Sequence, residues 1–269
     1  MPKVRVRDIE MYYEEGGTGP ALLLIMGLSG NLDWWGQPFL SDLEQHFRVI
    51  RFDNRGAGRT DRPAVPYSIS GFADDTVGLM DALSLEKAHV MGVSMGGMIA
   101  QELAVNEPQR VDKLVLGCTN CGPSHSVMAG PEVQAMLVQR PSSLDEVKAN
   151  TLRLLFPEDF ITANGAAMEA NWREITKAPI DNESFQRQVM ALLQWNSYDR
   201  LPEIKAPALI LHGTADILVP PQNAEVLAER IPNAKLRLYE GVGHGLNAQV
   251  PHEVARDVIA HLQSDSVPM

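Results

Sequence analysis

Short, continuous runs of apolar residues recur along this chain, and helical patterns separate them. The run Ala21-Leu22-Leu23-Leu24-Ile25-Met26 contains no polar residue, as expected of a strand that is buried on both faces of a parallel sheet. Strands of this kind that alternate with helices predict an α/β fold, in which helices cover both faces of a mostly parallel sheet. Similar runs span residues 48–52, 88–93, 113–118, 208–212 and 236–239.

Two more expected strands precede these runs at the N-terminal end. Residues 4–7 and 9–15 alternate between apolar and polar side chains around a turn, which predicts an antiparallel hairpin and brings the expected sheet to eight strands. Apolar residues recur at helical spacing in segments between the strands. The expected helices span residues 70–83, 95–105, 222–230 and 251–263.

The strand pattern disappears between residues 122 and 198. Prolines punctuate this stretch, and its remaining pattern is helical or irregular. Strand–helix alternation resumes afterwards, so the stretch is an insertion between two strands of one sheet. We therefore expect a core domain formed by residues 1–121 and 199–269, and a helical cap formed by residues 122–198 over the ends of the strands.

The sequence Gly92-Val93-Ser94-Met95-Gly96-Gly97 lies where one of the buried strands ends and a helix begins. The pattern Gly-x-Ser-x-Gly in this position predicts a nucleophile elbow, a sharp turn that exposes a serine hydroxyl. Its glycines remove side chains that would collide in so tight a turn. The helix that follows directs its first amides toward the serine oxygen, so Ser94 is the expected nucleophile.

A serine hydroxyl needs a base to activate it, and the base needs an acid that orients it. With this elbow, the acid and then the histidine follow the serine along the chain. Asp216 comes directly after the expected strand 208–212, and His244 lies in a glycine-rich loop after the last strand. We therefore expect Asp216 and His244 to complete a triad with Ser94. His212, at a strand end, is expected to pack beside the site.

The loop after the third strand reads Met26-Gly27-Leu28-Ser29-Gly30. Gly27 allows the backbone to approach a substrate closely. The N–H group of Leu28 is the expected oxyanion donor, together with the N–H group of Met95 at the start of the helix after Ser94.

Composition narrows the possible partners. Asp and Glu number 34 against 23 Lys and Arg, which gives a net charge of −11, and so acidic a surface repels nucleic acid and anionic membranes. The N-terminus lacks the apolar segment of a signal peptide, and no apolar run is long enough to span a bilayer. We expect a cytoplasmic protein whose partner is a small molecule, and the oligomeric state stays open.

Three further patterns predict no additional chemistry. Cys118 and Cys121 have the spacing of a redox motif, but Cys118 ends a buried strand, so a buried structural thiol is the better interpretation. The glycine-rich stretch 53–61 has neither dinucleotide nor Walker spacing, and we interpret it as a tight structural loop. No histidine pair has the spacing of metal ligands on a helix. We expect neither a metal nor a cofactor.

Taken together, these motifs resemble the α/β-hydrolase fold superfamily over almost the whole chain. The resemblance implies a Ser–Asp–His triad. It also implies similarity to small esterases and lactonases, including enol-lactone hydrolases, methylesterases and esterases that degrade acyl-homoserine lactones. The dehalogenase branch is disfavoured, because it has Asp where this chain has Ser94. The segments that carry the resemblance span residues 22–27, 52–58, 92–98, 206–213 and 243–245.

We therefore expect a serine hydrolase that cleaves carboxylic esters or lactones of neutral, apolar acyl groups through an acyl-enzyme. The resemblance adds N-acyl-homoserine lactones as candidate substrates. Two alternatives remain open: a cofactor-free perhydrolase of the haloperoxidase type, and a ligand receptor of the same fold with little turnover. The residues expected to contact the substrate are Gly27, Trp34, Met128, Trp195 and Leu218.

Overall fold

A single eight-stranded sheet forms the centre of the computed structural model, which describes residues 3–138 and 143–264. The strand order is β1-β2-β4-β3-β5-β6-β7-β8. The pairs β1–β2 and β2–β4 are antiparallel, and the other five pairs are parallel. The strands are β1 (Lys3–Val6), β2 (Ile9–Gly16), β3 (Ala21–Ile25), β4 (Arg48–Phe52), β5 (Ala88–Val93), β6 (Val111–Gly117), β7 (Ala208–Gly213) and β8 (Ala234–Tyr239).

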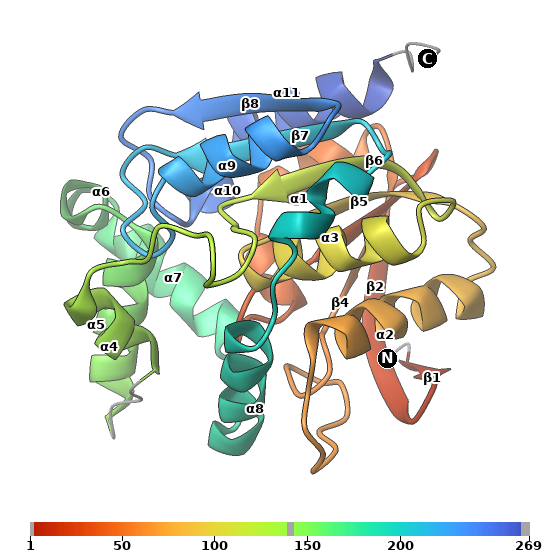
Figure 1. Cartoon of the computed structure of the whole chain (residues 1–269). Helices are drawn as coiled ribbons and strands as arrows, with labels where there is room; N and C mark the ends of the chain where they lie inside the picture. The colour runs from red at the N-terminus through yellow and green to blue at the C-terminus, as the bar shows by residue number, and fades with distance from the viewer. Residues whose placement is uncertain (1–2, 139–142, 265–269) are drawn as a thin grey trace.

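Helices cover both faces of this sheet (Figure 1). The helices α2 (Ile69–Ala82), α3 (Met95–Asn106) and α9 (Gln222–Arg230) pack on one face, and α1 (Phe39–Glu44) and α11 (Pro251–Gln263) pack on the other. The arrangement confirms the expected α/β-hydrolase fold class. The eight expected strands all begin and end within two residues of their predicted bounds.

Two separate hydrophobic cores lie on the two faces of the sheet, and β3 contributes to both. Leu23 and Ile25 belong to the core beneath α2 and α3, whereas Leu22 and Leu24 belong to the core beneath α1 and α11. All four side chains are fully buried, and each such burial stabilises the fold by about 1.5–3 kcal/mol. A strand with apolar partners on both faces has no place for a polar residue, which explains its continuous apolar sequence.

The segment where the sequence lost its strand pattern is here called the helical insertion (residues 122–198). Its described residues form five α-helices after β6. Figure 1 shows them gathered beside the ends toward which the arrows of β6 and β8 point. The described residues of the insertion, 122–138 and 143–198, contain no strand. The exact division into core and cap domains stays a prediction. The helices are α4 (Pro131–Val138), α5 (Leu144–Leu155), α6 (Glu158–Ala163), α7 (Gly165–Ile175) and α8 (Asn182–Leu193).

Three short elements complete the fold: the 3-10 helices η1 (Leu32–Trp35) and η2 (Tyr198–Glu203), and the single turn α10 (Leu246–Gln249). The first of these follows the loop after β3, and the last follows the loop that contains His244, so both flank loops in which site residues were expected. No helix in the described part of the chain has the length and apolar character needed to cross a membrane.

Candidate active site

Ser94 lies in the turn between β5 and α3. Its φ of 55° and ψ of −124° fall outside the regions that residues with a side chain readily adopt. The flanking glycines allow the turn to close: a Cβ atom at Gly92 would lie 2.1 Å from the carbonyl oxygen of Gly96, and a Cβ at Gly96 would lie 2.0 Å from that of Ile25. The turn therefore has the geometry of a nucleophile elbow.

Thr119, which follows β6, supports this elbow from one side. Its Oγ1 donates a hydrogen bond of 2.7 Å to the carbonyl oxygen of Ser94. A Cβ atom at Gly97 would lie 2.6 Å from the Cβ of Thr119, so the third glycine of the motif lets α3 begin directly against the neighbouring strand end. The strained backbone at Ser94 is thus held by Thr119 on the side of the turn that faces β6.

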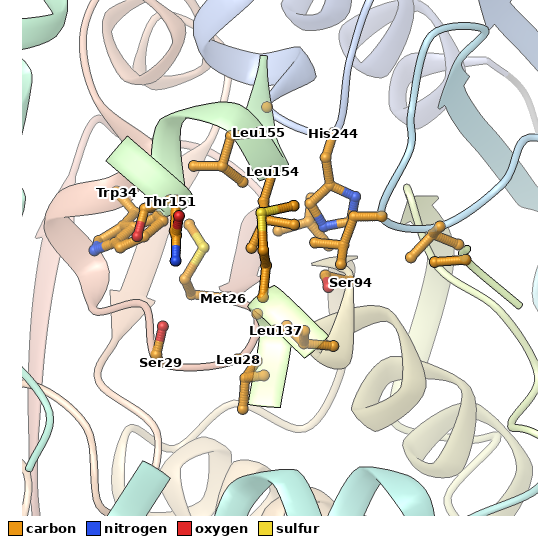
Figure 2. A pocket seen from close by; sticks show the side chains of 18 of the residues that line it. Met26, Leu28, Ser29, Trp34, Ser94, Leu137, Thr151, Leu154, Leu155 and His244 are labelled. Atoms are coloured by element: carbon orange, nitrogen blue, oxygen red, sulfur yellow. The ribbon is translucent and has the colours of Figure 1, made fainter. Parts of the chain in front are cut away.

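Asp216 and His244 come from the loops after β7 and β8 and meet beside Ser94. The Nδ1 atom of His244 lies 2.7 Å from Oδ2 of Asp216. A carboxylate only accepts hydrogen bonds, so Nδ1 carries a proton, and in the neutral imidazole Nε2 is then the acceptor. Figure 2 shows the ring of His244 directed at the side chain of Ser94. Within residues 3–138 and 143–264 the Ser94 hydroxyl has no hydrogen-bond partner. In sites of this kind the hydrogen bond between serine and histidine commonly forms or shortens once a substrate binds.

The carboxylate of Asp216 is fully buried and has donors at both oxygens. Its Oδ1 accepts hydrogen bonds of 2.9 Å from the N–H groups of Leu218 and Val219. Its Oδ2, besides contacting His244, lies 3.3 Å from Nε2 of the buried His212. Burial by itself would raise the pKa of Asp216, but the two histidines outweigh that effect and hold the pKa well below its usual range. The carboxylate is therefore ionised and fixed in place.

Cys118 lies behind the carboxylate, and with His212 and Asp216 it forms a buried group of three potential metal ligands. Burial and the neighbouring Asp216 raise the pKa of the Cys118 thiol well above its usual value, so the sulfur is protonated and a poor ligand. The carboxylate is already occupied by its donors. These residues do not fit a metal ion, and both cysteines are buried and unpaired, which agrees with a structural role.

The loop after β3 passes directly against Ser94. A Cβ atom at Gly27 would lie 2.9 Å from the Cβ of Ser94, so a larger residue would displace either the loop or the serine. In the described part of the chain, neither the N–H of Leu28 nor that of Met95 donates to a protein acceptor. Leu28 follows Gly27, which lies against Ser94, and Met95 follows Ser94 itself. Backbone donors without a protein partner at such positions can stabilise a negative charge that develops on a substrate oxygen.

The glycine-rich loop 53–61 supports the loop after β3, as its interpretation as a structural loop implies. That loop, residues 26–31, contains the expected oxyanion donor Leu28 and is here called the oxyanion loop. The side-chain amide of Asn54 donates a bond of 2.9 Å to the carbonyl oxygen of Met26. The buried carboxylate of Asp53 accepts bonds of 2.7 Å from the N–H groups of Leu32 and Arg59. The two loops are therefore joined by buried hydrogen bonds on both sides of Gly27.

A pocket with a cavity volume of about 250 Å³ lies over Ser94 and His244. Figure 2 shows side chains of the core and of the insertion around it, among them Met26 and Leu28 on one side and Leu154 on the other. None of the described residues that line it is Asp, Glu, Lys or Arg, and His244 is its one ionisable side chain among them. The pocket is therefore suited to a neutral molecule with a large apolar part.

Four of the five residues expected to contact a substrate line this pocket: Gly27, Trp34, Met128 and Leu218. The fifth prediction, Trp195, was wrong. Its ring packs in the core on the α3 face of the sheet, and its Nε1 donates a bond of 2.9 Å to Glu102. This residue lies where the insertion returns to the core, and there a large aromatic side chain is buried against α3 instead of facing the cavity.

The insertion supplies lining residues that the sequence did not single out, including Leu137, Asn150, Thr151 and Asn171. In α5, Val147, Thr151 and Leu154 follow one another at helical spacing and all line the pocket. That spacing was visible in the sequence. However, a stripe of this kind equally fits a helix that packs against a core, so it could not identify a binding surface.

Comparisons with known proteins agree with this architecture. A family model described as the alpha/beta hydrolase fold matches residues 20–249. The chain is 33% identical over 264 residues to RutD of Caulobacter sp. (strain K31), a protein named as a proposed carbamate hydrolase. The alignment covers 96% of this chain and 98% of that protein.

Solved structures give the same result. The enol-lactonase of Burkholderia xenovorans LB400 superimposes with a TM-score of 0.86 at 26% identity, over 98% of this chain and 100% of the other. Est816, described as an N-acyl homoserine lactone degrading enzyme, superimposes with a TM-score of 0.81 at 30% identity, over 96% and 98% of the two chains. These relatives are hydrolytic enzymes, and the family match spans most of the sequence. The chain belongs to the alpha/beta hydrolase fold family.

Proposed function

We propose that this hydrolase cleaves carboxylic esters or lactones of neutral, apolar acyl groups by way of an acyl-enzyme. In this proposal Ser94 is the nucleophile, His244 is the general base and Asp216 orients the imidazole, while the N–H groups of Leu28 and Met95 bind the oxyanion. The observation that carries the proposal is the placement of Ser94 and His244 in the wall of a pocket without a charged side chain among its described residues.

The steps of the reaction follow from the tautomer of His244. Its Nε2 takes the proton of the Ser94 hydroxyl while Oγ adds to the substrate carbonyl, and the resulting oxyanion lies between the two backbone donors. The imidazolium then gives its proton to the leaving alkoxide, which departs as an alcohol. In a lactone this alcohol stays attached to the acyl group. A water molecule, deprotonated by Nε2 of His244, next attacks the acyl carbonyl. The Ser94 oxygen leaves as the carboxylic acid is released, and the imidazolium returns its proton to that oxygen.

The lack of a charged side chain among the described lining residues favours some of the substrate classes that the relatives suggest over others. A free carbamate, or a substrate that carries a carboxylate, would enter the cavity as an anion and meet no cationic side chain among the described lining residues, and burying an unpaired charge is costly. A carbamate ester and an acyl-homoserine lactone are both neutral, and both contain a carbonyl that the same steps can open. They belong to the proposed substrate class, whereas free carbamate does not.

The test compares a neutral and an anionic ester of equal length, p-nitrophenyl butyrate and the p-nitrophenyl monoester of succinate. Wild-type protein should hydrolyse the neutral ester, and kcat/KM for the anionic ester should be at least about 100-fold lower. Ser94→Ala should lower kcat by on the order of 10⁴-fold or more, while a control change at the exposed Ser70, Ser70→Ala, should leave it unaltered. Equal activity of Ser94→Ala and wild type would refute the proposal.

The same preparation separates the two alternative functions. A receptor with little turnover would give one rapid burst of p-nitrophenol and then stall, because its acyl-enzyme would not be hydrolysed. A perhydrolase would form peracid from acetate and hydrogen peroxide faster than it hydrolyses esters. Assays with an N-acyl-homoserine lactone and an N-alkyl carbamate ester beside the simple esters would then rank the leaving groups.

A further inference from the structure

Gln188, in α8 of the helical insertion, is fully buried and joins two loops of the core. Its Oε1 accepts a hydrogen bond of 2.9 Å from the N–H of Ser29, in the loop after β3. Its Nε2 donates a bond of 3.1 Å to the carbonyl oxygen of Arg55, in the loop after β4. One side chain of the insertion thus contacts both the oxyanion loop and the loop that supports it.

An amide side chain suits these two contacts. The N–H of Ser29 can only donate and the carbonyl oxygen of Arg55 can only accept, so their common partner needs an acceptor at one end and a donor at the other. A carboxylate would place a second acceptor against the oxygen of Arg55. An apolar side chain of the same length would leave a buried donor and a buried acceptor without partners.

Ser29 is the residue directly after Leu28, the expected oxyanion donor. Its φ of 63° lies in the left-handed region, which a non-glycine residue occupies only where surrounding contacts hold it. The hydrogen bond to Gln188 is such a contact, because it fixes the peptide group that joins Leu28 to Ser29. A change in this bond therefore acts on the orientation of the neighbouring Leu28 peptide.

A second buried amide ties the same stretch to the insertion. The Nδ2 atom of Asn31 donates bonds of 3.1 Å and 2.9 Å to the carbonyl oxygens of Ile175 and Ala178, which lie at and beyond the end of α7. Asn31 is 1% exposed. The oxyanion loop is consequently attached to the insertion at two points, Ser29 and Asn31, through buried hydrogen bonds on either side of Gly30.

We propose that Gln188 is a positioning residue for hydrolysis: its bond to the Ser29 N–H holds the Leu28 N–H in the orientation that receives the oxyanion. The insertion then sets the geometry of transition-state stabilisation as well as covering the pocket. This inference rests on the proposed serine-hydrolase function. It places no contact between Gln188 and the substrate, so the ground-state affinity should depend little on this residue.

The test is Gln188→Met, which keeps the length of the side chain and removes both hydrogen bonds. A matched control is Gln101→Met, because Gln101 is also a fully buried glutamine and bonds Gly97, Asn120 and Ser197 in place of the oxyanion loop. For Gln188→Met we expect kcat on p-nitrophenyl butyrate to fall about 10- to 100-fold, with KM within about twofold of wild type. The control should keep kcat within about twofold of wild type.

Affinity for a trifluoromethyl ketone, which forms a tetrahedral adduct with an active serine, should fall by the same factor as kcat in Gln188→Met, because the adduct oxygen occupies the oxyanion hole. Gln188→Asn, which is polar but too short to reach both partners, should show the same loss and serves if Gln188→Met does not fold. A kcat for the Gln188 variants within twofold of Gln101→Met would overturn the inference. If Ser94→Ala is inactive in that case, the proposed function stands; if Ser94→Ala is as active as wild type, both fail.

Discussion

Replacing the buried carboxylate by an amide, Asp216→Asn, is the sharpest single test of the site. The two oxygens of Asp216 are not equivalent, because Oδ1 faces two backbone N–H groups, of Leu218 and Val219, and Oδ2 faces His244. An asparagine amide would keep its oxygen toward the two N–H groups, since its NH₂ group there would oppose two donors. The NH₂ group would then face Nδ1 of His244.

That orientation forces the opposite tautomer on the imidazole. Nδ1 would accept from the new amide, so the proton would move to Nε2, and Nε2 could no longer take the proton of Ser94. Trapping the wrong tautomer of a catalytic histidine lowers kcat by roughly 10⁴-fold, which corresponds to about 5 kcal/mol in the activation free energy. The substitution replaces one oxygen atom by an NH₂ group, so the pocket keeps its shape and KM should change little.

The assay is steady-state hydrolysis of p-nitrophenyl butyrate, with folding checked by near-UV circular dichroism. The chain offers a matched control in Asp42→Asn, because Asp42 also pairs with a histidine, His252, at 2.6 Å, but at a site where the imidazole is 71% exposed. Asp42→Asn should leave kcat unaltered. A folded Asp216→Asn protein that kept more than about a tenth of wild-type kcat would refute the assignment of Asp216 as the orienting acid.

Three further outcomes follow from the structure. Gly96→Ala would place a Cβ atom 2.0 Å from the carbonyl oxygen of Ile25, so it should both lower Tm and abolish ester hydrolysis, and a stable, active variant would contradict the elbow geometry. Trp195→Phe removes the bond to Glu102 outside the pocket, and urea titration should show a loss of about 1–2 kcal/mol in the free energy of unfolding with kcat unchanged. Burial, and to a smaller extent the charge of Lys113, lowers the pKa of His261 from 6.5 to about 4. Between these two pH values the unfolded chain binds a proton at His261 that the folded chain does not bind, so the free energy of unfolding falls as the pH drops from about 6.5 to 4. His261→Leu should flatten that slope in urea titrations across this range, and an unchanged slope would count against a buried neutral imidazole.

Local sequence patterns were sufficient to predict the sheet and the three residues that meet in the site. The elbow at Ser94 depends on residues within five positions of one another, so the spacing of its glycines predicts the turn directly. Asp216 and His244 are distant in sequence but come directly after expected strands, and parallel strands bring such positions to one edge of the sheet. The parallel arrangement of the strands, and not the motifs themselves, therefore predicted that Asp216 and His244 lie near Ser94.

The sequence did not predict the roles of side chains whose direction is set by tertiary contacts in irregular or helical segments. Trp195 and Trp34 are both large aromatic residues beside expected loops, yet one packs against α3 and the other lines the pocket. Gln188 gave no signal at all, because its partner Ser29 is 159 residues away and one glutamine in an amphipathic helix resembles any solvent-facing residue. Such roles require the tertiary contacts, which periodicity does not encode.

The loop that contains His244 is also bonded to the insertion, since the N–H of Gly245 donates a bond of 2.8 Å to the carbonyl oxygen of Leu155 at the end of α5. A Cβ atom at Gly243 would lie 2.6 Å from that same oxygen. The helical insertion, which lines the pocket over Ser94 and His244, is therefore not an interchangeable module. A chimera that exchanged it for the corresponding segment of a relative, in order to transfer substrate preference, would also exchange contacts that hold the loop of the proposed base, His244. Such a chimera would have to carry a compatible loop around His244 with it.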